Sequence, residues 1–256
     1  MAGQVILSSN ESSPMCALGS TFTDFDFESL LGPRAYVYIR NHDTSNMTAG
    51  LAVRQRSDIF TTEGTALTSD ANTTDLPQIK DADLPAPFST ALYIPNTLSR
   101  ALYWSANDTP SSLSHGKIHA NSTTVLYLED PPAALIGSDA YIAWLPYACI
   151  ITAIGDTLSV IGIAQNTITA SYYGWVQYGG FGYHYVLGGD NDATVADGIG
   201  VIPSASIAGM GQGFTAGTND GYIYAYSMID EAASEAGIYG PVMIASPYMH
   251  RYTNLP

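Results

Sequence analysis

The stretch that decides the fold is residues 172–187, which read YYGWVQYGGFGYHYVL. Aromatic and β-branched residues alternate with small ones in two runs, 172–179 and 182–187, and this pattern is typical of β-strands. The glycines within and between the runs permit tight coiling and close approach of a neighbouring backbone. Residues 163–187 contain no Lys, Arg, Asp or Glu. We therefore expect most of this stretch to be buried between strands or between subunits.

The rest of the chain continues the pattern on both sides. Gly, Pro, Asn and Asp recur at short intervals between β-branched and aromatic runs, which predicts an all-β fold, a small β-barrel or a sandwich. One helix is predicted, at residues 227–236. Along the chain we expect an extended N-terminal arm at 1–31, the first β-hairpin of the β domain at 32–56, an inserted loop-rich segment at 57–121, and the main β-barrel or sandwich domain at 122–256.

The charge balance excludes several classes of partner. The 256 residues include 8 Lys and Arg against 23 Asp and Glu, a formal net charge of −15 at pH 7. So few cations cannot neutralise nucleic-acid phosphates, and anionic membrane surfaces are disfavoured for the same reason. No apolar run reaches the roughly 20 residues that a membrane helix needs. A Tyr-rich, charge-poor surface is typical of the centres of protein interfaces, which favours an assembled protein.

Residues 163–213 carry a resemblance to a known family. They combine an A-x-N-x-x-x-A turn, the phrase YGWVQ and a G-x-x-x-x-P-S strand end. The matching residues are Ala164, Asn166, Ala170, Tyr173, Gly174, Trp175, Val176, Gln177, Gly198, Pro203 and Ser204. The segment resembles head decoration (cement) proteins of tailed bacteriophages. The stretch at 34–50 looks like the opening of such chains, whereas the long segment 57–121 departs from their compact barrel.

The resemblance implies a structural virion protein and not an enzyme. Such a protein would bind the outer surface of an icosahedral phage capsid, after synthesis in the host cytoplasm, and would stabilise the head lattice. Its implied partners are the major capsid protein and further copies of the chain in a homotrimer, with no nucleic acid, no membrane and no cofactor. We expect the N-terminal arm at 1–31 and the loop at 57–88 to contact neighbouring subunits.

Six side chains of the central stretch are the candidates for the core and for subunit contacts. They are Tyr173, Trp175, Gln177, Tyr178, Tyr183 and Tyr185. The aromatic residues could also form a sugar-binding platform. However, they alternate along strands and are too many for one small site, which favours core and interface roles.

No catalytic or metal-binding residue is assigned. His115 and His119 have the H-x-x-x-H spacing of a helical zinc site, but the neighbouring residues disfavour a helix and no Glu follows the first His. Asp190, Asp192 and Asp197 offer hard oxygens for calcium. An ordinary hairpin turn rich in Asp and Asn explains them better.

Two other functions stay open at this point. A phage tail, fibre or receptor-binding β-protein would share the Tyr-, Gly- and Ser-rich composition, and would bind glycans through exposed tyrosines. A β-sandwich glycoside hydrolase would need two carboxylates about 5–10 Å apart in a cleft, brought together by the fold.

Overall fold

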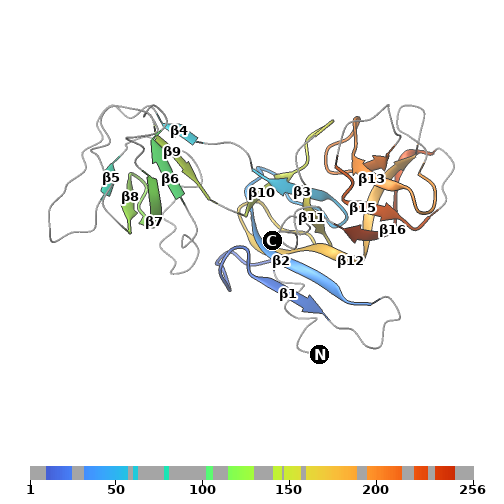
Figure 1. Cartoon of the computed structure of the whole chain (residues 1–256), viewed down its shortest axis with the longest axis horizontal. Coiled ribbons are helices and arrows are strands. Elements are labelled where there is room, and N and C mark those ends of the chain that lie inside the picture. The colour runs from blue at the N-terminus through green and yellow to red at the C-terminus, as the bar shows by residue number, and fades with distance from the viewer. Residues whose placement is uncertain are drawn as a thin grey trace, which may run out of the picture. The chain divides into compact units, whose positions relative to one another are not determined.

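The computed structural model describes residues 10–24, 32–56, 60–62, 78–80, 102–105, 115–129, 141–145, 147–156, 160–188, 195–214, 222–229 and 234–245. Within these residues the regular structure is all strand and includes no helix, so the predicted all-β class is confirmed (Figure 1). The chain divides into two compact units. The larger unit comprises residues 1–15, 19–56 and 147–256, and the smaller unit comprises residues 16–18 and 57–146.

The smaller unit contains a six-stranded antiparallel sheet in the order β4-β9-β6-β7-β8-β5. Its strands are β4 (Phe60–Thr62), β5 (Gln78–Lys80), β6 (Leu102–Ser105), β7 (His115–Asn121), β8 (Val125–Leu128) and β9 (Tyr141–Trp144). The segment expected to be a loop-rich insertion thus contributes β4 to β7 to a sheet. The boundary expected at residue 121 lies in a tight turn of that sheet, where the Ser122 N–H donates to the Val125 carbonyl over 2.8 Å.

The larger unit is a ten-stranded sheet in the order β1-β2-β10-β3-β11-β12-β14-β13-β15-β16, with further pairings of β2 with β12 and of β12 with β16. Its strands are β1 (Thr21–Asp24), β2 (Arg34–Asn41), β3 (Ala52–Gln55), β10 (Ala148–Ile151), β11 (Val160–Ala164), β12 (Tyr173–Gly188), β13 (Gly200–Pro203), β14 (Gly211–Gly213), β15 (Ala225–Ser227) and β16 (Ser234–Ala245). The extra pairings close two rings of strands. The first ring is β2-β10-β3-β11-β12, the second ring is β12-β14-β13-β15-β16, and both contain β12.

Strand β12 passes from one ring to the other at Gly179. This residue is paired with Ala35 of β2 on one side and with Ala245 of β16 on the other. The register with β2 shifts between Gln177 and Gly179, which marks a β-bulge. The buried Gln177 side chain donates through Nε2 to the carbonyls of Gly179 (3.0 Å) and Phe181 (2.7 Å). The two strands predicted at 172–179 and 182–187 are therefore one continuous strand, because a side-chain amide replaces the backbone partners lost at the bulge.

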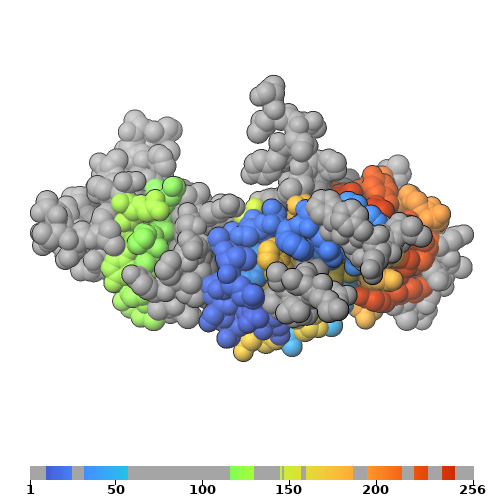
Figure 2. All heavy atoms as spheres, turned by 90° about the horizontal axis from the view of Figure 1, so that it is seen from below, coloured from blue at the N-terminus to red at the C-terminus, as the bar shows by residue number. Residues whose placement is uncertain are grey.

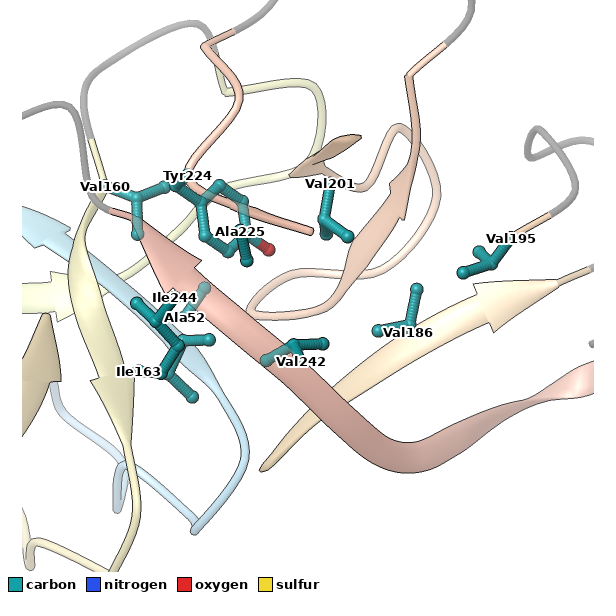
Figure 3. Close-up of a cluster of buried hydrophobic side chains, with 10 residues drawn as sticks. All are labelled: Ala52, Val160, Ile163, Val186, Val195, Val201, Tyr224, Ala225, Val242 and Ile244. Carbon is teal, nitrogen blue, oxygen red and sulfur yellow. The ribbon is translucent and has the colours of Figure 1, made fainter. Parts of the chain in front are cut away.

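The larger unit has two hydrophobic cores, and the second also takes Ala52, Val160 and Ile163 from β3 and β11 of the first ring. The first core comprises Val37, Ile39, Met47, Val53, Cys149, Ile161, Ala164, Ile168 and Val176. The second core, drawn in Figure 3, comprises Ala52, Val160, Ile163, Val186, Val195, Val201, Tyr224, Ala225, Val242 and Ile244. Strand β11 is buried along its whole length, with Ile161 in the first core and Ile163 in the second. Such burial of both faces explains why its sequence, VIGIA, is a continuous apolar run.

His184 lies between the rings and is fully buried. Its Nδ1 lies 2.7 Å from the Gly50 carbonyl oxygen and its Nε2 lies 2.5 Å from the Tyr224 hydroxyl. A carbonyl can only accept, so Nδ1 carries the proton and Nε2 accepts from Tyr224. Burial disfavours the charged imidazolium and lowers the pKa of His184 to about 4 from its usual 6.5, although the Gly50 carbonyl partly opposes the change.

Two sequence-based expectations need correction, and a third, the N-terminal arm, stays a prediction. Strands β2 and β3 do not form a hairpin at 32–56, because β10 lies between them, parallel to β2 and antiparallel to β3. The helix predicted at 227–236 is wrong, because β15 runs to Ser227 and β16 begins at Ser234. The part of the N-terminal arm that the structure describes pairs with its own chain, since β1 pairs with β2 and Glu11 forms a bridge with Tyr173. The expected contacts of the arm with neighbouring subunits stay a prediction.

The bulge in β12 yields a prediction about Gly180. Its φ is +84°, and an added Cβ would lie 2.2 Å from the Pro33 carbonyl oxygen. A left-handed alanine costs about 1–2 kcal/mol and a backbone collision about 1–3 kcal/mol more. We therefore expect Gly180→Ala to lower the free energy of unfolding by about 3 kcal/mol, measured by chemical denaturation. Gly198→Ala is the matched control, because its φ is +76° but nothing lies within 4 Å of the added Cβ. Equal losses in the two variants would contradict the proposed contact.

His184 yields a prediction about pH. The unfolded chain takes up a proton near pH 6.5, whereas the folded chain does so only near pH 4, so stability falls as the pH falls through this window. The shift corresponds to about 3 kcal/mol. We expect His184→Gln, which stays neutral, to show a clearly shallower loss of unfolding free energy between these pH values. His119→Gln at the exposed His119 should behave like the wild type. The idea fails if wild type and His184→Gln lose stability in parallel.

Candidate interaction surface

The six candidate residues separate into two groups along β12. Tyr173, Trp175 and Gln177 are buried on the outer side of the first ring, at 3%, 8% and 1% exposure. Tyr178 is partly buried and packs against the first core. Tyr183 and Tyr185 lie on the part of β12 that belongs to the second ring, and Tyr183 is 44% exposed. The first group is therefore internal structure, and the second group belongs to a surface.

The buried group forms an aromatic cluster with residues of β1 and β2. Tyr38 stacks on Tyr173 with ring centroids 6.2 Å apart, and its ring lies 5.1 Å from that of Trp175. Phe22 of β1 contacts Trp175 edge-on at 6.2 Å. The Arg40 guanidinium lies 5.7 Å from the centre of the Tyr173 ring, where burial lowers the pKa of Arg40 and raises that of Tyr173. The Met15 N–H donates to the Tyr38 hydroxyl at 3.0 Å, so the N-terminal segment covers this cluster.

The exposed group belongs to what we call the aromatic face, the outer side of β12, β15 and β16 in the second ring. Directly paired residues of adjacent strands project to the same side of a sheet. The pairs that define the face are Phe181 with Met243, Tyr183 with Pro241, Tyr185 with Tyr239, and Tyr226 with Met243. Met228 extends the face, because its N–H donates to the Pro241 carbonyl at 3.1 Å. The alternate residues of the same strands, among them Val186 and Val242, lie in the second core.

Five side chains of the aromatic face are large and exposed, and its tyrosines on β12 and β16 contact one another. Tyr183, Tyr226, Met228, Tyr239 and Met243 are between 39% and 45% exposed. Tyr183 and Tyr239 are stacked at 5.5 Å with an angle of 19° between their planes, and Tyr185 lies 4.9 Å from Tyr239. Partial burial raises the pKa of Tyr239, and the neighbouring tyrosines add to the effect. In Figure 2 the second ring supplies the orange and red surface.

Gly50 supports the tyrosines from the first ring. Its carbonyl accepts from the Tyr185 N–H at 3.1 Å. An added Cβ at Gly50 would lie 2.5 Å from the Tyr239 ring and 2.8 Å from the Tyr185 ring. The backbone therefore lies directly against both rings and fixes their positions, and only glycine leaves room for them.

The described side chains of the aromatic face carry no charge. Strands β12, β15 and β16 contain a single charged residue, Glu235, at the start of β16. The rest of the chain carries the remaining acidic residues. Tyr226, Tyr239 and Met243 were not among the sequence candidates, although the alternation of Tyr239, Pro241 and Met243 was a detectable signal.

In the part of the chain that the structure describes, the other candidate residues do not come together as a metal or catalytic site. His115 and His119 lie on strand β7, where four residues span roughly 13 Å, too far to share one metal ion. Asp197 is exposed, while Asp190 and Asp192 lie outside the described residues. Among the described residues no three His, Cys, Asp or Glu side chains gather as a metal site.

Three described carboxylates have partners, and the first, Glu129, lies 3.6 Å from the Lys117 ammonium in the smaller unit. Asp156 forms an ion pair with Arg54 and accepts from the Ala153 N–H at 3.3 Å. Asp43 accepts from the Ser45 hydroxyl at 3.2 Å and from the Ile151 N–H at 3.3 Å. The contacts of Asp156 and Asp43 fix turns. Within the described residues no helix is long and apolar enough to cross a membrane.

The comparisons with known proteins leave the aromatic face as the main guide to function. No family model, no curated protein and no solved structure matches this chain.

Proposed function

We propose that this chain is a structural virion protein that binds the outer surface of an icosahedral phage capsid, as a homotrimer, and stabilises the head lattice. The observation that carries the proposal is the aromatic face: an exposed, nearly uncharged surface on a chain of net charge −15. Tyr and Met are enriched and charged residues are depleted at the centres of protein interfaces. Such a surface supports a protein that works by burying area against other proteins.

The resemblance to phage head decoration proteins supports the phage capsid as the partner of this protein. The matching residues of 163–213 lie on β11, β12 and β13 and their connections, which build parts of both rings. Tyr173, Trp175 and Gln177 are buried on the part of β12 that leads to Gly179, where the strand changes ring. The resembling segment thus coincides with the centre of the larger unit.

The action would be mechanical. A bound protein that spans neighbouring capsid subunits adds its buried area to the cost of separating them, and standard interfaces bury about 1,600 Å². The two closed rings support this role, because a rigid scaffold loses little conformational freedom when it binds. Stabilisation then opposes rupture of the head under the internal pressure of its DNA.

A receptor-binding virion protein is the second candidate, favoured by one observation. Tyr183 and Tyr239 are stacked on each other and remain 44% exposed, so each presents aromatic surface to solvent. Sugar rings bind to such surfaces. Binding to a glycan array, without binding to heads, would favour this candidate over capsid decoration.

The proposal predicts salt-tolerant binding to heads. Heads that lack the protein, prepared from the phage that encodes the chain, should bind the purified protein in a co-sedimentation assay. The bound fraction should change little from about 0.1 M to about 1 M NaCl, because salt screens contacts between charges far more than apolar contacts. A basic protein such as lysozyme, held on acidic heads by charge, should be released over the same range. The absence of binding at any salt concentration would overturn the proposal.

A further inference from the structure

We infer that the aromatic face is the contact between copies of this chain. The inference rests on the proposed function and deepens it by naming the partner of this surface as a second copy. The residues concerned are Tyr183, Tyr226, Met228, Tyr239 and Met243, with Phe181, Tyr185 and Pro241 between them.

Charge is the first argument for a second copy. Two copies that each carry a net charge of −15 repel one another wherever their acidic surfaces meet. None of the described side chains of the aromatic face carries a charge, so they can meet their counterparts on a second copy without bringing like charges together. A cationic partner would instead be attracted to the acidic regions of the chain. An uncharged surface on an acidic chain therefore suits a partner that is equally acidic.

The way in which the strands are paired is the second argument. Strands β12 and β16 are partnered on both sides, since β12 also pairs with β2, β11 and β14, and β16 also pairs with β15. Association here must use the outward side chains and not the addition of a strand at an edge. Tyr and Met side chains suit contact with copies of themselves, because aromatic rings pair edge-to-face or offset and thioethers pack on rings.

Area and rigidity are the third argument. Five large side chains about two-fifths exposed offer on the order of 400 Å², when full burial of an aromatic side chain covers 150–250 Å². That is about half of what one partner contributes to a standard interface, and it forms the apolar centre that such interfaces have. The Tyr183–Tyr239 stack and the support from Gly50 hold the side chains in place before association. Little rotamer freedom is then lost on contact.

The test uses the full chain without heads, so that it is independent of capsid binding. Sedimentation velocity at micromolar concentration should give the wild type a mass that is a multiple of 27.2 kDa. Tyr183→Glu on β12 and Met243→Glu on β16 each place a charge in the face, and each should weaken self-association at least 10-fold. Ile154→Glu is the matched control. Ile154 is 59% exposed in the turn that follows β10 and is not one of the residues of the face, so this variant should assemble like the wild type.

The outcomes separate the two proposals. Circular dichroism shows whether Tyr183→Glu or Met243→Glu has lost its fold. If one of them has, the self-association of the other variant tests the inference. Face variants that assemble as well as Ile154→Glu would overturn the inference and leave the proposed function standing. A monomeric wild type would overturn the inference together with the homotrimer of the proposed function, and binding of that monomer to heads would leave only the capsid-binding role standing. A wild type that assembles through the face but ignores heads would leave the inference standing and overturn the proposed function.

Discussion

The larger unit depends on the way β12 changes partners in the middle of its length. Up to Gly179 the strand pairs with β2, and from Gly179 onward it pairs with β16. At such a change the backbone carbonyls lose their regular partners, and buried carbonyls left unpaired are costly. The amide of Gln177 meets this need by donating to Gly179 and Phe181, and the left-handed Gly180 lets the chain pass close to Pro33. β12 can belong to both rings because the backbone carbonyls near Gly179 keep hydrogen-bond partners where the strand changes ring.

The sequence predicted the class of fold and the character of β12, because alternation is a local property. Trp175 and Val176 do project to opposite sides, the first into the aromatic cluster and the second into the first core. The position of β10 between β2 and β3 could not be predicted, since it depends on residues about a hundred positions away. Residues 227–236 contain Ser, Asp, Glu and Ala, which suit a helix, but pairing of β16 with β12 overrides that propensity.

Only part of the candidate surface could be predicted from the sequence, again because it depends on residues distant in the chain. Tyr183 and Tyr185 belong to the stretch that we singled out, but the same alternation placed Tyr173 and Trp175 in one set with them. The two sets differ in whether another part of the chain buries them. β1 and the segment before it lie over Tyr173 and Trp175, whereas Tyr183 and Tyr239 stay exposed. The residues that bury a strand's side chains come from distant parts of the chain, so the periodicity of that strand alone cannot predict which of its side chains are buried.

The aromatic face is also tied to the interior of the molecule. The Gly50 carbonyl accepts hydrogen bonds from the Tyr185 backbone on the face and from His184 in the interior, and His184 in turn accepts from Tyr224 of the second core. Alternation along β12 places His184 inward between two outward tyrosines. A movement of the first ring at Gly50 would therefore shift the Tyr185 and Tyr239 rings as well as the His184 contact. The rigidity that makes the face suitable for protein contact thus derives from both rings together, because neither ring alone supplies Gly50, His184 and Tyr239.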